Sequence, residues 1–364
     1  MFTPQFNSRS HVLQDNLREI DRLRFRIENM LLMPKHEQWL RREAFVRTAF
    51  TSTMVENATI GEDELEASAR PSPSATIPKE RPDVVNYGKA LELVDSLSDE
   101  PEAVLDTIEV TLRNMHFLLM SGIEGERVQP GRYRKIDNKV GDQGIPVYSP
   151  PPLFDVPDLM RDFALWLRSD SAIHPVCRAG IAHLHFVAIH PFVDGNGRTA
   201  RLLAALLLQM SGYGFRKLLS LDAYYQRNRD PYIDALRVSV GPGFSTSYDA
   251  TPWLEFFTRS IVAQAATLER RLTDWQMTVA AIHGRYKSHG LRDREIDGLI
   301  YAVRLGQLTR GDYCEIAGVG LVTATRDLRH LAALGLLEAV GTTRARRYLP
   351  AVELKEVPRG GDSR

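Results

Sequence analysis

The sequence is poor in cysteine and has no net charge. It holds two cysteines, Cys177 and Cys314, which lie far apart and form no CxxC pair. A disulfide framework or a thiolate zinc site is therefore not expected, and a reducing cytosol suits the chain. Lys and Arg number 46, and so do Asp and Glu. A whole-molecule field for nucleic acid or an anionic membrane is thus absent, which leaves only a local patch for such a role.

Long apolar runs are also missing. No stretch approaches the ~20 apolar residues that span a bilayer, and the start of the chain lacks the basic residues and apolar run of a signal peptide. We therefore expect a cytoplasmic protein without membrane contact. Apolar residues still make up 43% of the 364-residue chain, enough for a sizeable core. A prior of ~150 residues per domain predicts two or three domains.

Helical periodicity dominates what is present, so the predicted fold class is mainly α. Apolar residues three and four apart predict helices in residues 1–100, which contain a Pro- and Ser-rich connector at 71–83. Residues 101–260 continue this pattern as a core, interrupted at 130–152, where Gly, Pro and β-formers predict a small hairpin. We then expect a linker helix at 261–290, a helix-turn-helix with two short strands at 291–357, and a flexible tail at 358–364.

The stretch HPFVDGNGRTAR, residues 190–201, separates two apolar helical segments. Gly195 and Gly197 allow the backbone to turn tightly and to approach a ligand without a Cβ in the way. The next helix is expected to begin between Asn196 and Arg198. Its first N–H groups lack partners within the helix, and together with the helix dipole they form a site that accepts phosphate.

The charged residues of this stretch suit phosphoryl or nucleotidyl transfer. Arg198 and Arg201 share one helical face and can bind phosphate oxygens. Asp194 offers a hard oxygen ligand for Mg²⁺ held together with substrate phosphates. His190 can act as a general base toward a hydroxyl. A plain turn is the alternative, but two arginines on one face after it have little use in packing, because buried unpaired charges are costly.

These twelve residues resemble the signature of the Fic family, HxFxxGNGRxxR with an acid at the second variable site. The resemblance covers about residues 101–260. It implies a Fic-type helical core, which usually transfers AMP from ATP to a hydroxyl side chain of a target protein. The implied roles are His190 as the base, Asp194 as the Mg²⁺ ligand, Gly195, Asn196 and Gly197 as the phosphate cradle, Arg198 and Arg201 as clamps on the outer phosphates, and Phe192 as a core anchor.

A flap that docks the target is implied at 130–152. The segment VGDQGIPVYSPPP resembles the hairpin of the family to which a target segment adds as a strand. PGRYR, residues 130–134, resembles the short motif before that flap, although alone it also reads as a plain turn. The expected acceptors are Ser, Thr or Tyr hydroxyls of a target protein, with the chain's own residues among them. Fic relatives often dimerise, so a homodimer is a further expectation.

The stretch TSTMVENATI holds Ser52 and Glu56 four residues apart, on one face of a helix expected at about 40–58. Read alone, it is a surface helix end with Asn57 as its cap. Beside the catalytic signature it resembles (S/T)xxxE(G/N), the inhibitory motif of many Fic proteins. The resemblance implies that Glu56 pairs with Arg201 in the place of the γ-phosphate, which misaligns ATP for in-line attack. Whether the same glutamate also helps to remove AMP from a target is left open.

Several other side chains have two readings each. Tyr232 sits where relatives place residues against the adenine, so it either stacks on the base or packs in the core. His183 and His185 are two residues apart and cannot share a helical face, which favours core packing over metal binding. His116 is interpreted in the same way.

Residues 291–350 resemble a winged helix. Their basic side chains form a local positive face: Arg326, Arg329, Arg344, Arg346 and Arg347. Such a module either reads DNA in the major groove or docks a protein, and the acidic residues nearby favour the protein role. One alternative to an adenylyltransferase is therefore a nucleotide-sensing winged-helix transcription regulator without transferase activity. Another is the same core with a different donor, such as UTP or a choline-bearing nucleotide.

Overall fold

The chain folds as two compact units, each built from separate segments of the sequence. The computed structural model describes residues 2–56, 77, 80–123, 129–142, 145–169, 172–287, 290–342 and 346–355. Within these, the first unit comprises residues up to 28, 44–56 and 77–265, and the second comprises 29–43 and the residues from 266 onward. Asn57, Arg344 and the predicted tail at 358–364 lie outside the described residues.

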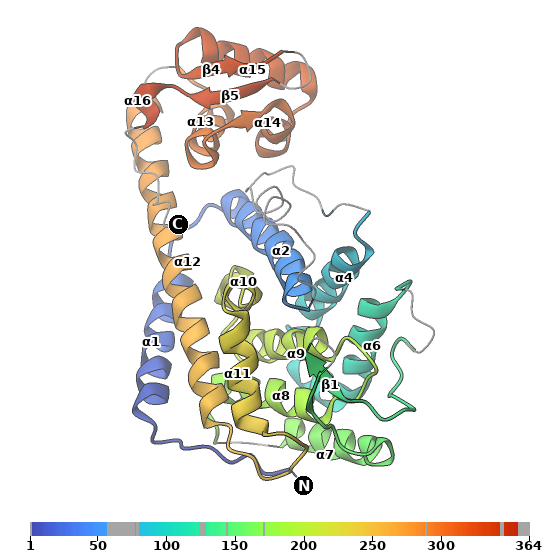
Figure 1. Ribbon diagram of the computed structural model, residues 1–364. Helices are drawn as coiled ribbons and strands as arrows, with labels where there is room; N and C mark the ends of the chain where they lie inside the picture. The colour runs from blue at the N-terminus through green and yellow to red at the C-terminus, as the bar shows by residue number, and fades with distance from the viewer. Residues whose placement is uncertain are drawn as a thin grey trace. The chain divides into compact units, whose positions relative to one another are not determined.

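The first unit is helical, as the sequence predicts, and the mainly α fold class is confirmed (Figure 1). Its helices are α1 (His11–Glu28), the C-terminal part of α2 (Pro34–Glu56), α4 (Pro82–Leu97), α5 (Pro101–Asp106), α6 (Ile108–Met120), α7 (Val156–Arg168), α8 (Pro175–Ile189), α9 (Asn196–Met210), α10 (Asp222–Arg227), α11 (Arg229–Val240) and the N-terminal part of α12 (Thr251–Tyr286). Two short 3₁₀ helices, Leu153–Asp155 and Phe215–Lys217, complete it.

Helices α8 and α9 form the centre of this unit. They pack against each other, and α9 also contacts α4 and α6. Leu202, Leu203 and Leu206 of α9 are completely buried, so burial of apolar side chains holds the start of α9 in place. Gly180 of α8 lets α12 approach closely, since a Cβ at this position would collide with Leu254 and Phe257.

The hairpin predicted at 130–152 is present as two short strands. β1 (Val140–Asp142) pairs antiparallel with β2 (Ile145–Tyr148), with an irregular register after Val140. Tyr148 donates its hydroxyl to the carbonyl of Ala188 at 2.7 Å, and Ser149 forms a bridge with Gly243. These contacts fix the base of the hairpin beside the C-terminal end of α8.

The second unit combines several helices with a small sheet. Beside the remaining parts of α2 and α12 it contains α13 (Asp293–Leu305), β3 (Leu308–Thr309), α14 (Arg310–Ala317), α15 (Leu321–Ala333), β4 (Leu337–Val340), β5 (Arg347–Pro350) and α16 (Val352–Lys355). The strands pair antiparallel in the order β3-β5-β4, so that β3 joins the two expected strands. The helix-turn-helix element corresponds to α14 and α15, and the assignment to winged-helix proteins stays a prediction.

An aromatic cluster fills the core of the second unit. Trp39 stacks on Trp275 with ring centroids 5.2 Å apart, and Tyr301 meets both rings edge-on. Asp327 of α15 is fully buried and binds Arg292 and Arg294. Burial raises the pKa of Asp327, but Arg294, Tyr313 and Arg292 together outweigh it and hold that pKa below its ordinary value.

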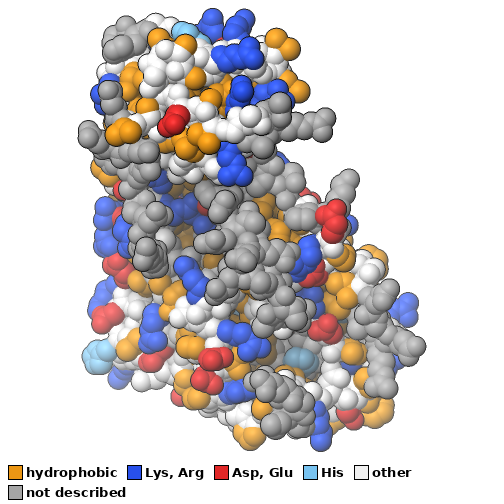
Figure 2. Space-filling view, turned by 45° about the horizontal axis from the view of Figure 1, so that its top comes forward, with side chains coloured by type: hydrophobic (Ala, Val, Ile, Leu, Met, Phe, Trp, Pro, Cys, Tyr) orange, Lys and Arg blue, Asp and Glu red, His pale blue; other side chains and the backbone are white. Residues whose placement is uncertain are grey.

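Charged side chains are unevenly distributed on the face drawn in Figure 2. Lys and Arg prevail over acidic side chains in the upper part of the view, whereas both signs occur side by side in the lower part. Among the helices described, none is long and apolar enough to cross a bilayer.

Candidate active site

The loop between α8 and α9 has a strained and well-anchored backbone. His190 ends α8 in the left-handed conformation, with φ 51° and ψ 58°, which is uncommon for residues other than glycine. Gly195 precedes α9 with φ 78°. Phe192 is completely buried between them, which agrees with its expected role as an anchor. The side chain of Asn196 accepts from the N–H of Phe192 and donates to its carbonyl, both at 2.9 Å.

Two further side chains hold this loop from outside. Arg134, the last residue of PGRYR, is buried and donates through Nε to the carbonyl of His190 at 3.0 Å. His116 stacks on Phe192 with ring centroids 3.6 Å apart. Its Nδ1 accepts from the N–H of Gly131 at 2.9 Å, so Nε2 carries the proton and donates to the carbonyl of Asp194 at 3.0 Å. The motif before the hairpin is therefore coupled to the loop by hydrogen bonds.

His190 is neutral and exposes one nitrogen. Burial lowers the pKa of its imidazole to about 4, although nearby Glu56 acts in the opposite direction. Nδ1 lies 3.3 Å from the carbonyl of Val187, and this contact places the proton on Nδ1. Nε2 is then unprotonated, which is the state that a general base requires.

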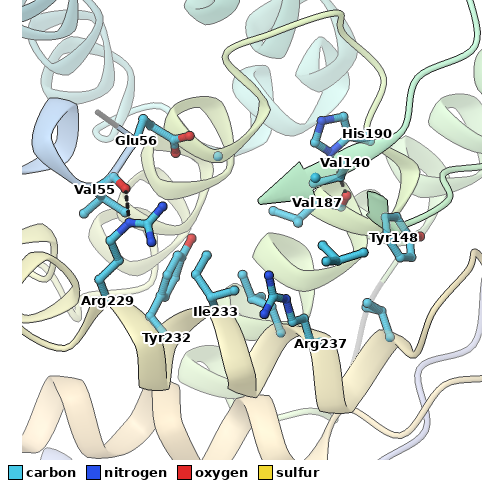
Figure 3. A pocket seen from close by; sticks show the side chains of 15 residues that line it. Val55, Glu56, Val140, Tyr148, Val187, His190, Arg229, Tyr232, Ile233 and Arg237 are labelled. Atoms are coloured by element: carbon cyan, nitrogen blue, oxygen red, sulfur yellow. Dashed lines mark hydrogen bonds between the residues drawn. The ribbon is translucent and has the colours of Figure 1, made fainter. Parts of the chain in front are cut away.

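His190 and Glu56 line one cavity of about 170 Å³. Figure 3 shows the two side chains on the same side of it, facing the α11 residues Tyr232 and Ile233. The rest of the wall comes largely from three elements: the hairpin with Val140 and Tyr148, the start of α9 with Gly197, and α11 with Arg229 and Arg237. The predicted base, the predicted regulatory acid and the helix N-terminus thus share one concave site.

The carboxylate of Glu56 occupies the N-terminus of α9. It lies so close to Gly197 that a Cβ at that position would collide with Oε1. The same oxygen accepts from NH1 of Arg201 at 2.9 Å. Burial raises the pKa of Glu56, but the charges of Arg201 and Arg198 outweigh it and hold that pKa below its ordinary value. An anion therefore already fills the place where the sequence predicts phosphate binding.

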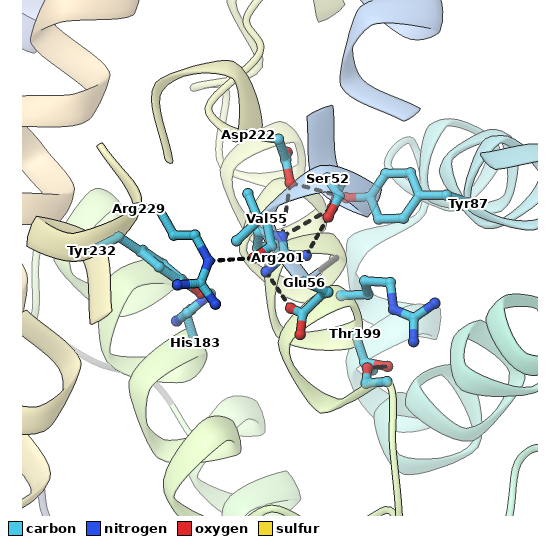
Figure 4. A network of polar contacts seen from close by, with 12 residues as sticks. Ser52, Val55, Glu56, Tyr87, His183, Thr199, Arg201, Asp222, Arg229 and Tyr232 are labelled. Atoms are coloured by element: carbon cyan, nitrogen blue, oxygen red, sulfur yellow. Dashed lines mark hydrogen bonds and ion pairs between the residues drawn. The ribbon is translucent and has the colours of Figure 1, made fainter. Parts of the chain in front are cut away.

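Arg201 lies at the centre of a polar network (Figure 4). Its side chain is 1% exposed. Nε donates to the hydroxyl of Ser52 and faces Asp222 Oδ1, both at 2.9 Å, and NH2 donates to the carbonyl of Ser52 at 2.9 Å. The structure thus brings both predicted regulatory residues, Ser52 and Glu56, to the predicted phosphate clamp.

Arg198 and Asp194 form a second, looser pair. NH2 of Arg198 lies 3.3 Å from Oδ2 of Asp194, and Oδ1 accepts from the N–H of Gly195 at 2.6 Å. The side chain of Asp194 is 56% exposed, whereas that of Arg198 is 7% exposed. Nε of Arg198 is buried and has no hydrogen-bond partner among the described residues. This arrangement leaves the carboxylate of Asp194 open to solvent, while Nε of Arg198 is enclosed by the protein.

Known proteins match this part of the chain. Residues 105–208 match the model of the Fic/DOC family. The chain therefore contains a Fic domain. It is 37% identical over 116 residues to the "Protein adenylyltransferase Fic" of Drosophila erecta, and 42% identical over 108 residues to a "Probable protein adenylyltransferase" of Aquifex aeolicus. Each match covers 30% of this chain and 22% or 30% of the relative, so the chain spans less than a third of the curated relatives that it matches.

Solved structures share the fold. A Fic family protein from Desulfovibrio desulfuricans G20 superposes with a TM-score of 0.62 at 23% identity, over 96% of this chain and 99% of that one. A Fic domain containing signaling protein from Bacteroides thetaiotaomicron VPI-5482 gives a TM-score of 0.53 at 20% identity, over 72% and 97% of the two chains. At these identities the likeness establishes the fold alone.

Tyr232 packs in the core of the first unit and also lines the cavity. Its ring is 2% exposed and stacks on Tyr225, with centroids 4.8 Å apart. Its hydroxyl lies 3.3 Å from Nε2 of His183. The core reading of Tyr232 thus holds in the structure, while contact with an adenine stays a prediction.

The remaining histidines of α8 also pack in the core. His183 stacks on Trp253 at 4.7 Å, and His185 stacks on Phe2 at 3.5 Å and bonds the hydroxyl of Tyr248. Within the described residues no group of three or more His, Cys, Asp or Glu is placed to hold a metal ion.

Three residues of the site carry no sequence signal. Asp222 of α10 binds Arg201, and the hydroxyl of Tyr87 from α4 lies 3.5 Å from Asp222 Oδ1. Arg229 of α11 donates through Nε to the carbonyl of Val55 at 3.0 Å, next to Glu56. No motif or spacing marks these residues, because folding alone brings α4, α10 and α11 to the end of α2.

Proposed function

We propose that this Fic protein is an adenylyltransferase that transfers AMP from ATP to a Ser, Thr or Tyr hydroxyl of a target protein, and that Glu56 inhibits it. The names of its curated relatives support the reaction class. One observation carries the proposal. The carboxylate of Glu56 lies on the N-terminus of α9 and on Arg201, in the cavity that His190 also lines.

The triphosphate of ATP would take the place of this carboxylate. The first N–H groups of α9 lack partners within the helix and favour an anion. Both polar atoms of the Asn196 side chain are engaged with Phe192, so its contribution would come from the backbone N–H. NH1 of Arg201 would pass from Glu56 to a phosphate oxygen, and the guanidinium of Arg198, whose contact with Asp194 is 3.3 Å long, would turn toward a second phosphate oxygen. Two guanidinium groups would then bind the outer phosphates.

His190 would act on the acceptor hydroxyl. Its unprotonated Nε2 takes the proton as the hydroxyl oxygen attacks the α-phosphorus. The bond between that phosphorus and the oxygen bridging to the β-phosphate breaks, and pyrophosphate leaves. Most of the catalysis in such a transfer is positioning and charge stabilisation, so Glu56 inhibits by keeping Arg201 from the phosphates and thereby misaligning the α-phosphorus.

The site suits Mg²⁺ held jointly with substrate. Asp194 presents one exposed carboxylate oxygen beside the phosphate site. One or two carboxylates plus substrate phosphates are the usual ligands of Mg²⁺ in such sites. When bound, the ion would neutralise charge on the phosphates. The other oxygen of Asp194 is held by the N–H of Gly195, which fixes the orientation of the carboxylate.

The rest of the cavity would hold the nucleoside and admit the target. Its wall at α11 is largely apolar, with Ile233, Leu236 and Val240 beside Tyr232, as a purine requires. The hairpin strands β1 and β2 border the same cavity. A target segment added to this hairpin would bring its hydroxyl toward His190. The chain's own residues and a second copy of the chain are further candidate partners.

The test is intact-mass spectrometry of the Glu56→Gly protein incubated with Mg²⁺ and each of the four nucleoside triphosphates. We expect a gain of one or more AMP units with ATP, and no gain when His190→Ala is added. A gain in mass with UTP alone would mean that the donor is UTP and not ATP. A protein that gains nothing with any triphosphate, yet shifts DNA in a gel, would instead favour the nucleotide-sensing regulator, with α15 as the DNA-binding helix.

A further inference from the structure

Arg201 is shared by two carboxylates that meet different edges of its guanidinium. Glu56 binds NH1 and Asp222 faces Nε, both at 2.9 Å. Figure 4 shows the two acids approaching Arg201 from different directions, Asp222 next to Ser52 and Glu56 on the other side. A role for Glu56 is implied by its motif, whereas nothing in the sequence accounts for Asp222.

The two acids also differ in exposure. The side chain of Glu56 is 34% exposed and lines the cavity, whereas that of Asp222 is 9% exposed and is not part of the cavity wall. A ligand that enters the cavity can therefore replace Glu56 and cannot reach Asp222. A ligand can thus replace the acid that binds NH1 of Arg201, whereas the acid that faces Nε stays in place.

The fold holds Asp222 at Nε of Arg201. The hydroxyl of Tyr87 lies 3.5 Å from Oδ1 of Asp222. Burial raises the pKa of Tyr87, and Asp222 raises it further, so the phenol stays protonated and is a donor. Figure 4 draws a contact between Ser52 and Asp222 as well. Burial raises the pKa of Asp222, and the charge of Arg201 opposes this rise. The carboxylate lies 2.9 Å from the guanidinium, which is the geometry of an ion pair.

We propose that Asp222 is a positioning residue for Arg201. Asp222 lies at Nε of the guanidinium, keeps it in place and balances its charge. NH1 can therefore pass from Glu56 to a phosphate while the buried cation still has a carboxylate partner. A buried ion loses much stability when its last partner is removed. Asp222 thus makes the Glu56 contact reversible. This inference deepens the proposed function and rests on it for the role of the phosphate.

The experiment is a double-mutant cycle of thermal unfolding, without nucleotide, on the full chain. The variants are Glu56→Gly, Asp222→Asn and the double variant. Each single variant leaves Arg201 with one carboxylate, and the double variant leaves it with none. We therefore expect the Tm of the double variant to fall about 3–6 °C further than the sum of the two single losses. If Asp222 only supports α10, the losses add, and the proposal is wrong.

A matched control is Asp327→Asn. Asp327 is also a buried carboxylate bound to arginines, but it belongs to the second unit. Its loss should be additive with Glu56→Gly, because the two residues share no partner. Non-additivity of the same size in this pair would show a general loss of cooperativity and would overturn the assignment of Asp222.

A third substitution covers the case in which the double variant fails to fold. Arg201→Met removes the cation that the two acids share and keeps a long apolar side chain. Without a charge to balance, the triple variant should fold again, because apolar replacement of a whole buried ion pair is tolerated. A triple variant that stays unfolded refutes the proposal. A failed AMP-transfer assay would count against the proposed function and leave this cycle as it stands, since the cycle uses no nucleotide.

Discussion

Release of the Glu56 contact should raise the proposed AMP transfer by a factor that follows from the strength of this contact. In Glu56→Gly the carboxylate at the start of α9 is lost and NH1 of Arg201 becomes free. Because the side chain is 34% exposed, solvent screens the pair, and the contact contributes about as much as a hydrogen bond to a charged group, about 1.5–3 kcal/mol. At ~1.4 kcal/mol per factor of ten, the state in which Glu56 binds Arg201 is favoured about 10- to 100-fold over the state in which NH1 is free.

The assay is the initial rate of self-labelling from ATP radiolabelled at the α-phosphate, at saturating ATP and Mg²⁺. We expect Glu56→Gly to label about 10 to 100 times faster than the unchanged chain, and Glu56→Gln to label at a rate between the two.

A matched control lies on the same helix. Glu43 of α2 pairs with Arg271, outside the cavity, so Glu43→Gln removes one ion pair from α2 without touching Arg201. It should label at the unchanged rate. Equal labelling by the Glu56→Gly and unchanged chains, with His190→Ala inactive in both, would refute the argument that Glu56 blocks the phosphate site.

Three other predictions concern the same loop and cavity. Arg229→Ala removes the bond to the carbonyl of Val55 and should raise basal labelling about fivefold, since one such bond is worth about 1 kcal/mol; an unchanged rate at saturating ATP would contradict this. Arg134→Ala removes the donor to the His190 carbonyl and should lower kcat of the Glu56→Gly protein about 100-fold through misplacement of the base, with KM for ATP nearly constant in steady-state assays. Burial lowers the pKa of His190 to about 4, so the base should stay unprotonated in mildly acidic solution. We expect kcat/KM of the Glu56→Gly protein to remain near its plateau down to about pH 5.5. A base with the ordinary pKa of ~6.5 would have lost about nine tenths of the rate at that pH.

The sequence alone was sufficient to place the candidate residues of the loop at 190–201 between two helices. Helical periodicity on both sides marked α8 and α9, and Gly195 marked the turn between them, because these features are local and repeat at fixed spacings. The spacing of Ser52 and Glu56 placed both on one helical face for the same reason. The mainly α class and the hairpin at 130–152 follow from equally local signals.

Only the tertiary structure decided what surrounds that chemistry. Asp222 and Arg229 reach the end of α2 from helices that are far from it in sequence, and their types and spacing carry no periodic signal. The left-handed backbone of His190 and the buried donor from Arg134 are likewise invisible in the sequence, because long-range packing imposes both. Local spacing determines which side chains share a helical face, whereas packing of distant helices determines which charges meet.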